Sequence, residues 1–154
     1  MGLDMYLHAR RVLADYDFQP DEKQISKEIY KLLSVEDVVE HNNSISVDIP
    51  VAYWRKANAI HRWMVENVQG GEDDCGEYWV SRDAAAKLLE VCINVRKDPS
   101  KAKELLPPQE GFFFGSAEVD DWYLRQIGYT VDRLSLIIDN PDLKDFDFYY
   151  QSSW

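Results

Sequence analysis

Hydrophobic and polar residues alternate in several short stretches of the chain, which is the period of a strand with one buried face. In residues 2–9, Leu3, Met5 and Leu7 share one face and polar residues share the other. Similar short stretches, bounded by turn residues, occur at residues 45–49, 77–80 and 145–150. The pattern therefore predicts four short strands, with one near each end of the chain.

Apolar residues three or four positions apart predict about four helices between these strands. The first covers Asp21 to about Leu33 and has Ile25, Ile29 and Leu32 at helical spacing. The others are expected from Pro50 to Gly70, after a Ser81 cap, and after a Ser116 cap up to Asn140, with a short extra one near residues 99–106.

Strands near both ends of the chain, without a regular strand-helix-strand repeat, favour an α+β fold. We expect a small, mostly antiparallel sheet packed by helices. A chain of 154 residues is long enough for one core and short for two ordinary domains. Residues 1–154 are therefore expected to form a single globular domain.

The formal net charge of −11 disfavours binding to other anionic molecules and surfaces. Such an acidic protein is a poor non-specific ligand for nucleic acid or for an anionic membrane. An acidic mimic of nucleic acid that occupies a basic protein stays open as an alternative. The apolar runs are too short to span a bilayer and the first residues lack a signal-peptide pattern, so we expect a cytoplasmic protein.

The two cysteines, Cys75 and Cys92, form neither a C-x-x-C pair nor a zinc-ligand spacing, and the three histidines add no such pattern. We expect both thiols to be reduced, with no structural metal and no cofactor. Cys92 falls in the apolar stripe of its predicted helix, so its expected role is packing.

Candidate chemistry is densest between Pro50 and Ser81, where His61 lies within the apolar arc of the expected helix. A histidine in that position is most often a neutral core residue with hydrogen-bond partners. The functional interpretation is a pocket in which His61, Asn58 and Trp54 project in neighbouring directions and bind a polar ligand. Both interpretations stay open.

The acidic turn that contains Asp74 and Cys75 extends this candidate ligand site. It supplies a carboxylate or thiolate near His61 in the functional interpretation, and it is a solvated turn in the other. No local signature of a cysteine hydrolase accompanies these residues. We therefore assign no catalytic residue and lean against an enzyme.

Two further features suit an anionic ligand such as a nucleotide. Arg55 and Arg62 lie seven positions apart, although Arg62 is also spaced to pair with Glu66 on a solvated face. Ser116 ends the GFFFGS run at an expected helix start, where backbone N–H groups bind anions. The run matches neither a Walker A loop nor a dinucleotide fingerprint, and three Phe residues in a row are more often buried.

The long helix near the C-terminus carries a second apolar stripe, which consists of Trp122, Tyr129 and Leu136 with Arg133 beside them. A helix with two apolar stripes is either covered on both sides or offers one of them to a partner. These four residues are the candidate partner-binding surface.

The segments MGLDMYL, YWRKANAIHRWMV, DDCGEYWVS and GFFFGS, followed by DDWYL, together resemble a family of small proteins carried by tailed bacteriophages and bacterial genomes. Those proteins begin with MGLDMYL and share a WRKANxIHxW-like segment, and the resemblance covers most of the chain. It implies a phage accessory protein rather than a virion part, with no activity attached. The matching positions are Trp54, Arg55, Lys56, Asn58, His61, Trp63, Asp74, Cys75 and the GFFFGS loop, while Met64 stands where Phe is expected.

We therefore expect a phage-encoded accessory protein that acts by binding, with inhibition of a host factor of anti-phage defence as the expected effect. The first alternative is a small-molecule or nucleotide-binding protein, either a sponge or a weak hydrolase, with its pocket near His61. The second alternative is the nucleic-acid mimic. A host protein is the expected partner, a nucleotide ligand and a homodimer stay open, and direct binding to nucleic acid or membrane is not expected.

Overall fold

The computed structural model describes residues 2–14, 16–40, 44–111 and 115–154. Its strands are β1 (Asp4–Ala14), β2 (Ser44–Arg55), β3 (Glu77–Val80) and β4 (Asp147–Ser153). Its helices are α1 (Pro20–Leu33), α2 (Asn58–Asn67), α3 (Arg82–Lys97), α4 (Ala102–Leu105) and α5 (Asp121–Ile137). Short 3-10 turns occupy Pro99–Lys101 and Pro141–Leu143. The predicted α+β fold is confirmed.

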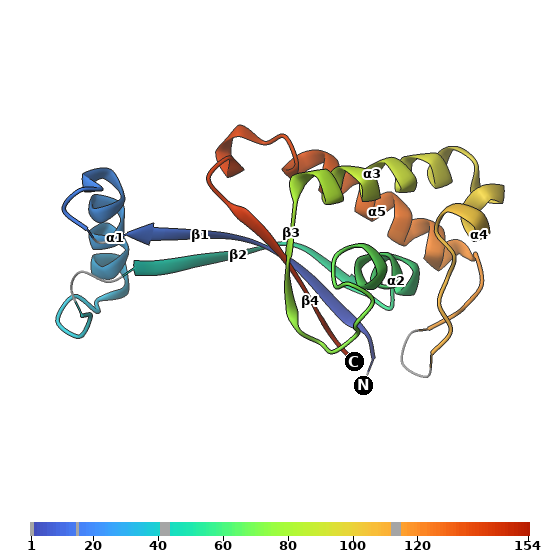
Figure 1. Cartoon of the computed structure of the whole chain (residues 1–154), viewed down its shortest axis with the longest axis horizontal. Helices are drawn as coiled ribbons and strands as arrows, with labels where there is room; N and C mark the ends of the chain where they lie inside the picture. Colours follow the sequence, from blue (N-terminus) through green and yellow to red (C-terminus); the bar gives the residue numbers. More distant parts are fainter. Residues whose placement is uncertain (1, 15, 41–43, 112–114) are drawn as a thin grey trace. The chain divides into compact units, whose positions relative to one another are not determined.

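The strands form one sheet in the order β2-β1-β4-β3, and each strand runs antiparallel to its neighbours (Figure 1). The register of β3 on β4 places Trp79 opposite Tyr149 and Val80 opposite Phe148. The strands nearest the two ends of the chain, β1 and β4, are therefore neighbours in the middle of the sheet.

Contacts divide the chain into two compact units. The larger unit consists of Met1–Ala9 and Pro50–Trp154, and the smaller one of Arg10–Ile49. Strands β1 and β2 run from one unit into the other. The expectation of a single domain stays a prediction.

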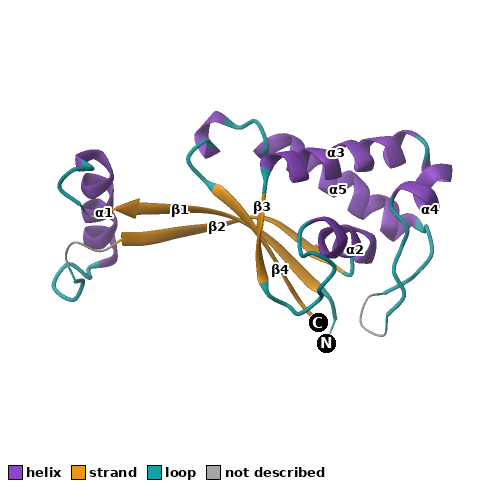
Figure 2. Cartoon of the chain, in the orientation of Figure 1, coloured by secondary structure: helices purple, strands orange, loops and turns teal. Residues whose placement is uncertain are grey.

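The core of the larger unit lies between one face of the sheet and the helices α2, α3 and α5 (Figure 2). The alternation expected in residues 2–9 is present, because Leu3, Met5 and Leu7 are fully buried. Helices α3 and α5 lie side by side and bury their stripes in the same core. Those stripes are Leu88, Cys92 and Val95 on α3, and Ile127, Val131 and Leu134 on α5.

Two helix starts test the predicted caps. Ser81 caps α3 as predicted, since its hydroxyl accepts a hydrogen bond from the backbone N–H of Ala84 at 3.0 Å. The Ser116 cap on α5 is wrong, because α5 begins at Asp121 and the Asp120 carboxylate accepts from Tyr123 N–H at 2.8 Å. Ser116 instead accepts from the N–H of Glu118 in a local turn.

The second strand is longer than predicted, and the helix after Pro50 starts later. β2 continues through Pro50 to Arg55, and α2 begins only at Asn58. Pro50 is tolerated because β2 is an edge strand. Trp54 therefore projects from a strand into the core and not from the helix that carries His61.

The smaller unit buries few of its large side chains. Helix α1 covers the predicted range, yet its buried positions are Ser26 and Tyr30. Ile25, at 37% exposed, and Leu32, at 83%, lie outside that buried face. Further exposed apolar side chains of this unit are Val12, Tyr16, Phe18, Leu33, Val38 and Ile49.

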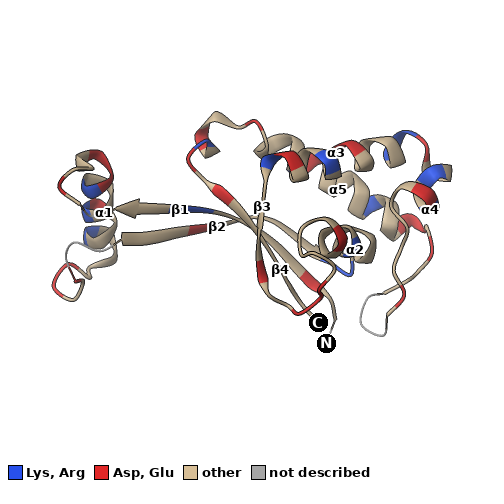
Figure 3. Ribbon diagram, in the orientation of Figure 1, with Lys and Arg blue, Asp and Glu red and all other residues tan. Residues whose placement is uncertain are grey.

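Acidic and basic residues are interspersed along α1, α3 and α5 (Figure 3). Within the described ranges, no helix is both long enough and apolar enough to cross a bilayer.

Candidate functional site

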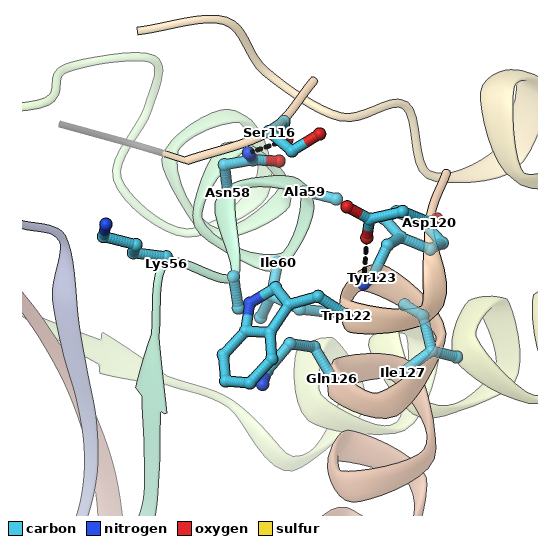
Figure 4. Close-up of a pocket in the computed structure, with 11 residues that line it drawn as sticks. Lys56, Asn58, Ala59, Ile60, Ser116, Asp120, Trp122, Tyr123, Gln126 and Ile127 are labelled. Carbon is cyan, nitrogen blue, oxygen red and sulfur yellow. Dashed lines mark hydrogen bonds between the residues drawn. The ribbon is translucent and has the colours of Figure 1, made fainter. Parts of the chain in front are cut away.

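A narrow pocket lies where the beginning of α2 meets the beginning of α5 (Figure 4). Its water-accessible volume is about 10 Å³, which is room for about one water molecule. Its polar lining residues are Lys56, Asn58, Ser116, Asp120 and Gln126, and Trp122 and Tyr123 contribute aromatic rings. Of the predicted ligand-site residues, the pocket thus brings together Asn58 and Ser116, with Trp122 from the predicted partner surface.

Asn58 connects two parts of the chain that lie on either side of this pocket. Its side-chain N–H group donates to the carbonyl of Ser116 at 2.8 Å, and its side-chain oxygen accepts from the N–H of Gln109 at 3.2 Å. The side chain is 5% exposed. Asn58 therefore holds Gln109 and Ser116, the two ends of the 109–116 segment. Of the predicted GFFFGS site, residues 112–114 lie outside the described residues.

Lys56 has an unusual backbone conformation, with φ of 55°. This left-handed conformation is uncommon for a residue with a side chain, and it makes the bend between β2 and α2. Gly115 packs against it, because a Cβ atom at Gly115 would come 3.3 Å from the Cβ of Lys56 and Gly115 itself has φ of 91°. The bend brings the end of β2 against Gly115.

His61 is fully buried at the centre of a hydrogen-bonded chain. Its Nδ1 lies 2.8 Å from the hydroxyl of Tyr150, and its Nε2 lies 2.9 Å from Oδ2 of Asp73. The other oxygen of Asp73 accepts from the indole N–H of Trp154 at 3.1 Å. Burial raises the pKa of Tyr150, so its hydroxyl keeps a proton that it can donate.

Both ring nitrogens of His61 therefore have a protein partner. A carboxylate only accepts, so Nε2–H of His61 donates to Asp73, and Nδ1 of His61 shares the second hydrogen bond with the Tyr150 hydroxyl. The arrangement holds the imidazole in one orientation and joins α2 to β4. Neither His61 nor Tyr150 lines the pocket. His61 is therefore a buried core residue with hydrogen-bond partners and not a pocket-lining residue.

Asp74 and Cys75 form a surface turn and do not make these contacts. The Asp74 carboxylate accepts from the N–H of Gly76 at 2.8 Å and from the hydroxyl of Tyr78 at 3.0 Å, and these bonds lower the pKa of Asp74. Cys75 has φ of 59° and is half-buried. The carboxylate that binds His61 is therefore the neighbouring one, Asp73.

The remaining ligand-site residues are dispersed. Trp54 is buried, and its indole N–H donates to the hydroxyl of Thr130 at 2.8 Å. Arg55 lies exposed at the end of β2. Arg62 pairs with Glu66 at 2.7 Å on the outside of α2, which is the solvated-face interpretation.

The four residues of the predicted partner surface on α5 have different surroundings. Trp122 and Leu136 are exposed, at 42% and 55%. Tyr129 and Arg133 instead bind the edge strand β2, since the Tyr129 hydroxyl accepts from Tyr53 N–H at 3.1 Å and Arg133 donates twice to the carbonyl of Val51. These contacts occupy backbone groups that an edge strand would otherwise offer to another chain.

The sequence pattern missed Asp73, Tyr150 and Trp154. Acidic residues in a turn and aromatic residues in a terminal strand carry no spacing that links them to His61. Among the described residues, no cluster of three or more His, Cys, Asp or Glu side chains is arranged to hold a metal ion.

Comparison with known proteins identifies no relative of this chain. No family model matches the chain, and no curated protein or solved structure matches it significantly.

Proposed function

We propose that this chain acts by binding another protein through the apolar stripe Ile25, Ile29 and Leu32 on α1. On the resemblance to phage proteins, we further propose that it is a phage-encoded accessory protein, that the partner is a host protein in the bacterial cytoplasm, and that binding inhibits it. The observation that carries the proposal is the exposure of Ile25 and Leu32, with Ile29 half-buried between them.

The three residues are spaced i, i+4 and i+7, so they form one line along the helix. A stripe of this kind normally faces a core, and here Leu32 is 83% exposed while Ser26 and Tyr30 occupy the buried side. An amphipathic helix that inserts such a stripe into the groove of a partner is a common mode of protein recognition. Burying one leucine side chain contributes about 1.5 to 3 kcal/mol.

Charge indicates what kind of partner fits. Asp21 and Glu28 lie one helical turn from Ile25 and border the stripe. A groove with an apolar floor and basic residues at its rim complements them. A second copy of the chain fits less well, because parallel pairing would place Glu28 against Glu28 and each copy carries a net charge of −11.

The pocket gives less support to the small-molecule alternative. It has room for about one water molecule, and Trp54, Arg55 and Asp74 lie elsewhere. His61 already binds protein groups through both ring nitrogens. The nucleic-acid mimic has no specific support either, because lysines and arginines interrupt the acidic residues along α1, α3 and α5.

The experiment is affinity capture from a bacterial lysate with three forms of the full-length chain. Leu32→Gln replaces the most exposed residue of the stripe by a polar side chain of similar helix propensity. Leu136→Gln on α5 is the matched control, because it makes the same change at another exposed leucine. The captured protein is identified by mass spectrometry, purified and tested for direct binding.

We expect a host protein that the wild type and Leu136→Gln capture and that Leu32→Gln loses, and whose activity falls when the purified wild-type chain is added. Loss with Leu136→Gln alone would move the interface to α5 and contradict the proposal. Equal capture by all three forms, or capture of no protein, would also contradict it.

A further inference from the structure

The second face of the sheet, opposite α2, α3 and α5, carries a group of aromatic side chains within the larger unit. Strand alternation places them there, because Met5 and Leu7 on β1 and Phe148 and Tyr150 on β4 point into the core. The aromatic residues of this outer face are Tyr6 and His8 on β1, Tyr53 on β2, Trp79 on β3 and Tyr149 on β4.

These rings form two neighbouring groups. Tyr6 lies 5.3 Å from Tyr53 and 6.0 Å from His8 between ring centroids. Trp79 stands directly opposite Tyr149 in the register of β3 and β4. Trp79 is 57% exposed and Tyr53 is 44% exposed, which is unusual for large aromatic side chains on a strand.

A carboxylate is bonded to the polar edge of one ring in each group. The Tyr53 hydroxyl donates to Oδ1 of Asp4, and the Trp79 indole N–H donates to Oδ1 of Asp147 at 3.3 Å. The hydrogen bond to Asp4 raises the pKa of Tyr53, so this ring stays protonated at neutral pH. In each of these two hydrogen bonds, one of the two carboxylate oxygens is the acceptor.

We propose that this outer face binds arginine side chains of a basic polypeptide segment. A guanidinium group stacks on a Tyr or Trp ring and donates N–H groups to a carboxylate beside that ring. Asp4 beside Tyr53 and Asp147 beside Trp79 supply two such places. The face lies in the larger unit and uses no residue of α1, so it is a separate site from the proposed α1 interface.

The negative charge of this face favours arginine over nucleic acid, which also binds to aromatic faces of sheets. Nucleic-acid bases also stack on exposed rings, but a strand of phosphates would meet Asp4, Asp147 and a net charge of −11. Lysine offers a single strongly hydrated charge and no plane to stack, so arginine fits better than lysine.

The test uses fluorescence anisotropy with a fluorescein-labelled ten-residue peptide that alternates Arg and Gly, at about 0.1 M salt, where charges more than about 10 Å apart are screened. The matching Lys-Gly peptide and a ten-nucleotide single-stranded DNA are measured in parallel. The variants are Trp79→Ala with Phe18→Ala as its control, and Asp147→Asn with Glu90→Gln as its control. Phe18 and Glu90 are exposed residues that do not belong to the outer face, so each control removes an aromatic ring or a charge from elsewhere. Circular dichroism verifies folding.

We expect the Arg-Gly peptide to bind several-fold more tightly than the Lys-Gly peptide, and the DNA to show no binding. Trp79→Ala and Asp147→Asn should each weaken binding of the Arg-Gly peptide by about threefold to thirtyfold, as expected for a cation held on an aromatic face. The controls should change it less than twofold. Equal effects of each variant and its control would show that binding does not depend on this face and overturn the proposal. Binding of the DNA, or equal affinity for both peptides, would overturn it as well.

Discussion

The hydrogen-bonded chain around His61 predicts that removing one hydroxyl, by Tyr150→Phe, destabilises the protein. The substitution keeps the ring and its packing and deletes only the group that bonds Nδ1 of His61 at 2.8 Å. Tyr150 and His61 are both fully buried, so solvent does not replace the lost bond. Any loss of stability therefore reports the hydrogen bond and not a large cavity.

The expected loss follows from the cost of disrupting a buried polar contact. Leaving a buried donor or acceptor without its bond costs about 1–3 kcal/mol. With a urea m-value of about 2 kcal/mol/M, this lowers the urea midpoint by about 0.5–1.5 M at unchanged m. Tyr78→Phe is the matched control, because it removes a hydroxyl that bonds Asp74 in the surface turn, where changes are within about 0.5 kcal/mol.

Urea unfolding followed by far-UV circular dichroism measures both variants. If Tyr150→Phe were as stable as the wild type, or if Tyr78→Phe were equally destabilised, the chain around His61 would not stabilise the fold as described.

Four further predictions rest on Asn58, Cys92 and Ser81. Asn58→Ala removes the hydrogen bonds to Gln109 and Ser116, so it should lower the free energy of unfolding by about 1–3 kcal/mol. It should also speed proteolysis between residues 109 and 116, and an unchanged rate of proteolysis would contradict this role of Asn58. Burial raises the pKa of Cys92 to about 12, so a thiol reagent at pH 8 should modify Cys75 alone until urea is added, and rapid modification of two thiols would show Cys92 to be accessible. The unfolded chain loses the Cys92 proton first, near its ordinary pKa of 9.0, so the free energy of unfolding should fall as pH rises from about 9 to 12, and Cys92→Ala should make the fall shallower. Ser81→Ala should cost about 1 kcal/mol in urea unfolding through the lost cap on α3, and no change would mean that the cap is dispensable.

The pattern of apolar residues predicted most of the fold because it reports which side of an element is buried. Alternation of apolar residues predicted β1, and their helical spacing predicted α3 and α5, since in each case the apolar side of the element faces the core. The same spacing in α1 predicted the helix but not its orientation. Ile25 and Leu32 lie outside its buried face, and spacing alone does not say which face a neighbour covers.

The sequence failed where local signals compete. Residues 53–60 contain apolar positions that suit a helix, and tertiary pairing with β1 keeps the first of them in a strand: the backbone N–H of Lys56 donates to the carbonyl of Leu3 at 2.7 Å. This pairing separates Trp54 from His61, so the site expected on one helix face is divided. Asp73 could not be distinguished from Asp74 by sequence, because only the turn geometry decides which carboxylate reaches His61.

The prediction of a partner surface on α5 was incomplete because sequence does not show which of its residues contact other parts of the fold. Sequence identifies the apolar and basic residues of a second stripe, but it does not reveal that Tyr129 and Arg133 bind the backbone of β2. Long-range contacts of this kind follow from the fold and leave no periodic trace in the chain.

The most direct test of protein binding through α1 is the dissociation constant of the purified complex. Isothermal titration calorimetry would compare the wild type, Leu32→Gln and Leu136→Gln against the partner identified by capture. Burial of Leu32 at the interface predicts binding about tenfold to hundredfold weaker for Leu32→Gln, from about 1.5–3 kcal/mol of lost burial. Leu136→Gln should bind within twofold of the wild type. Equal dissociation constants for the wild type and Leu32→Gln would contradict the claim that the exposed stripe of α1 is the binding surface.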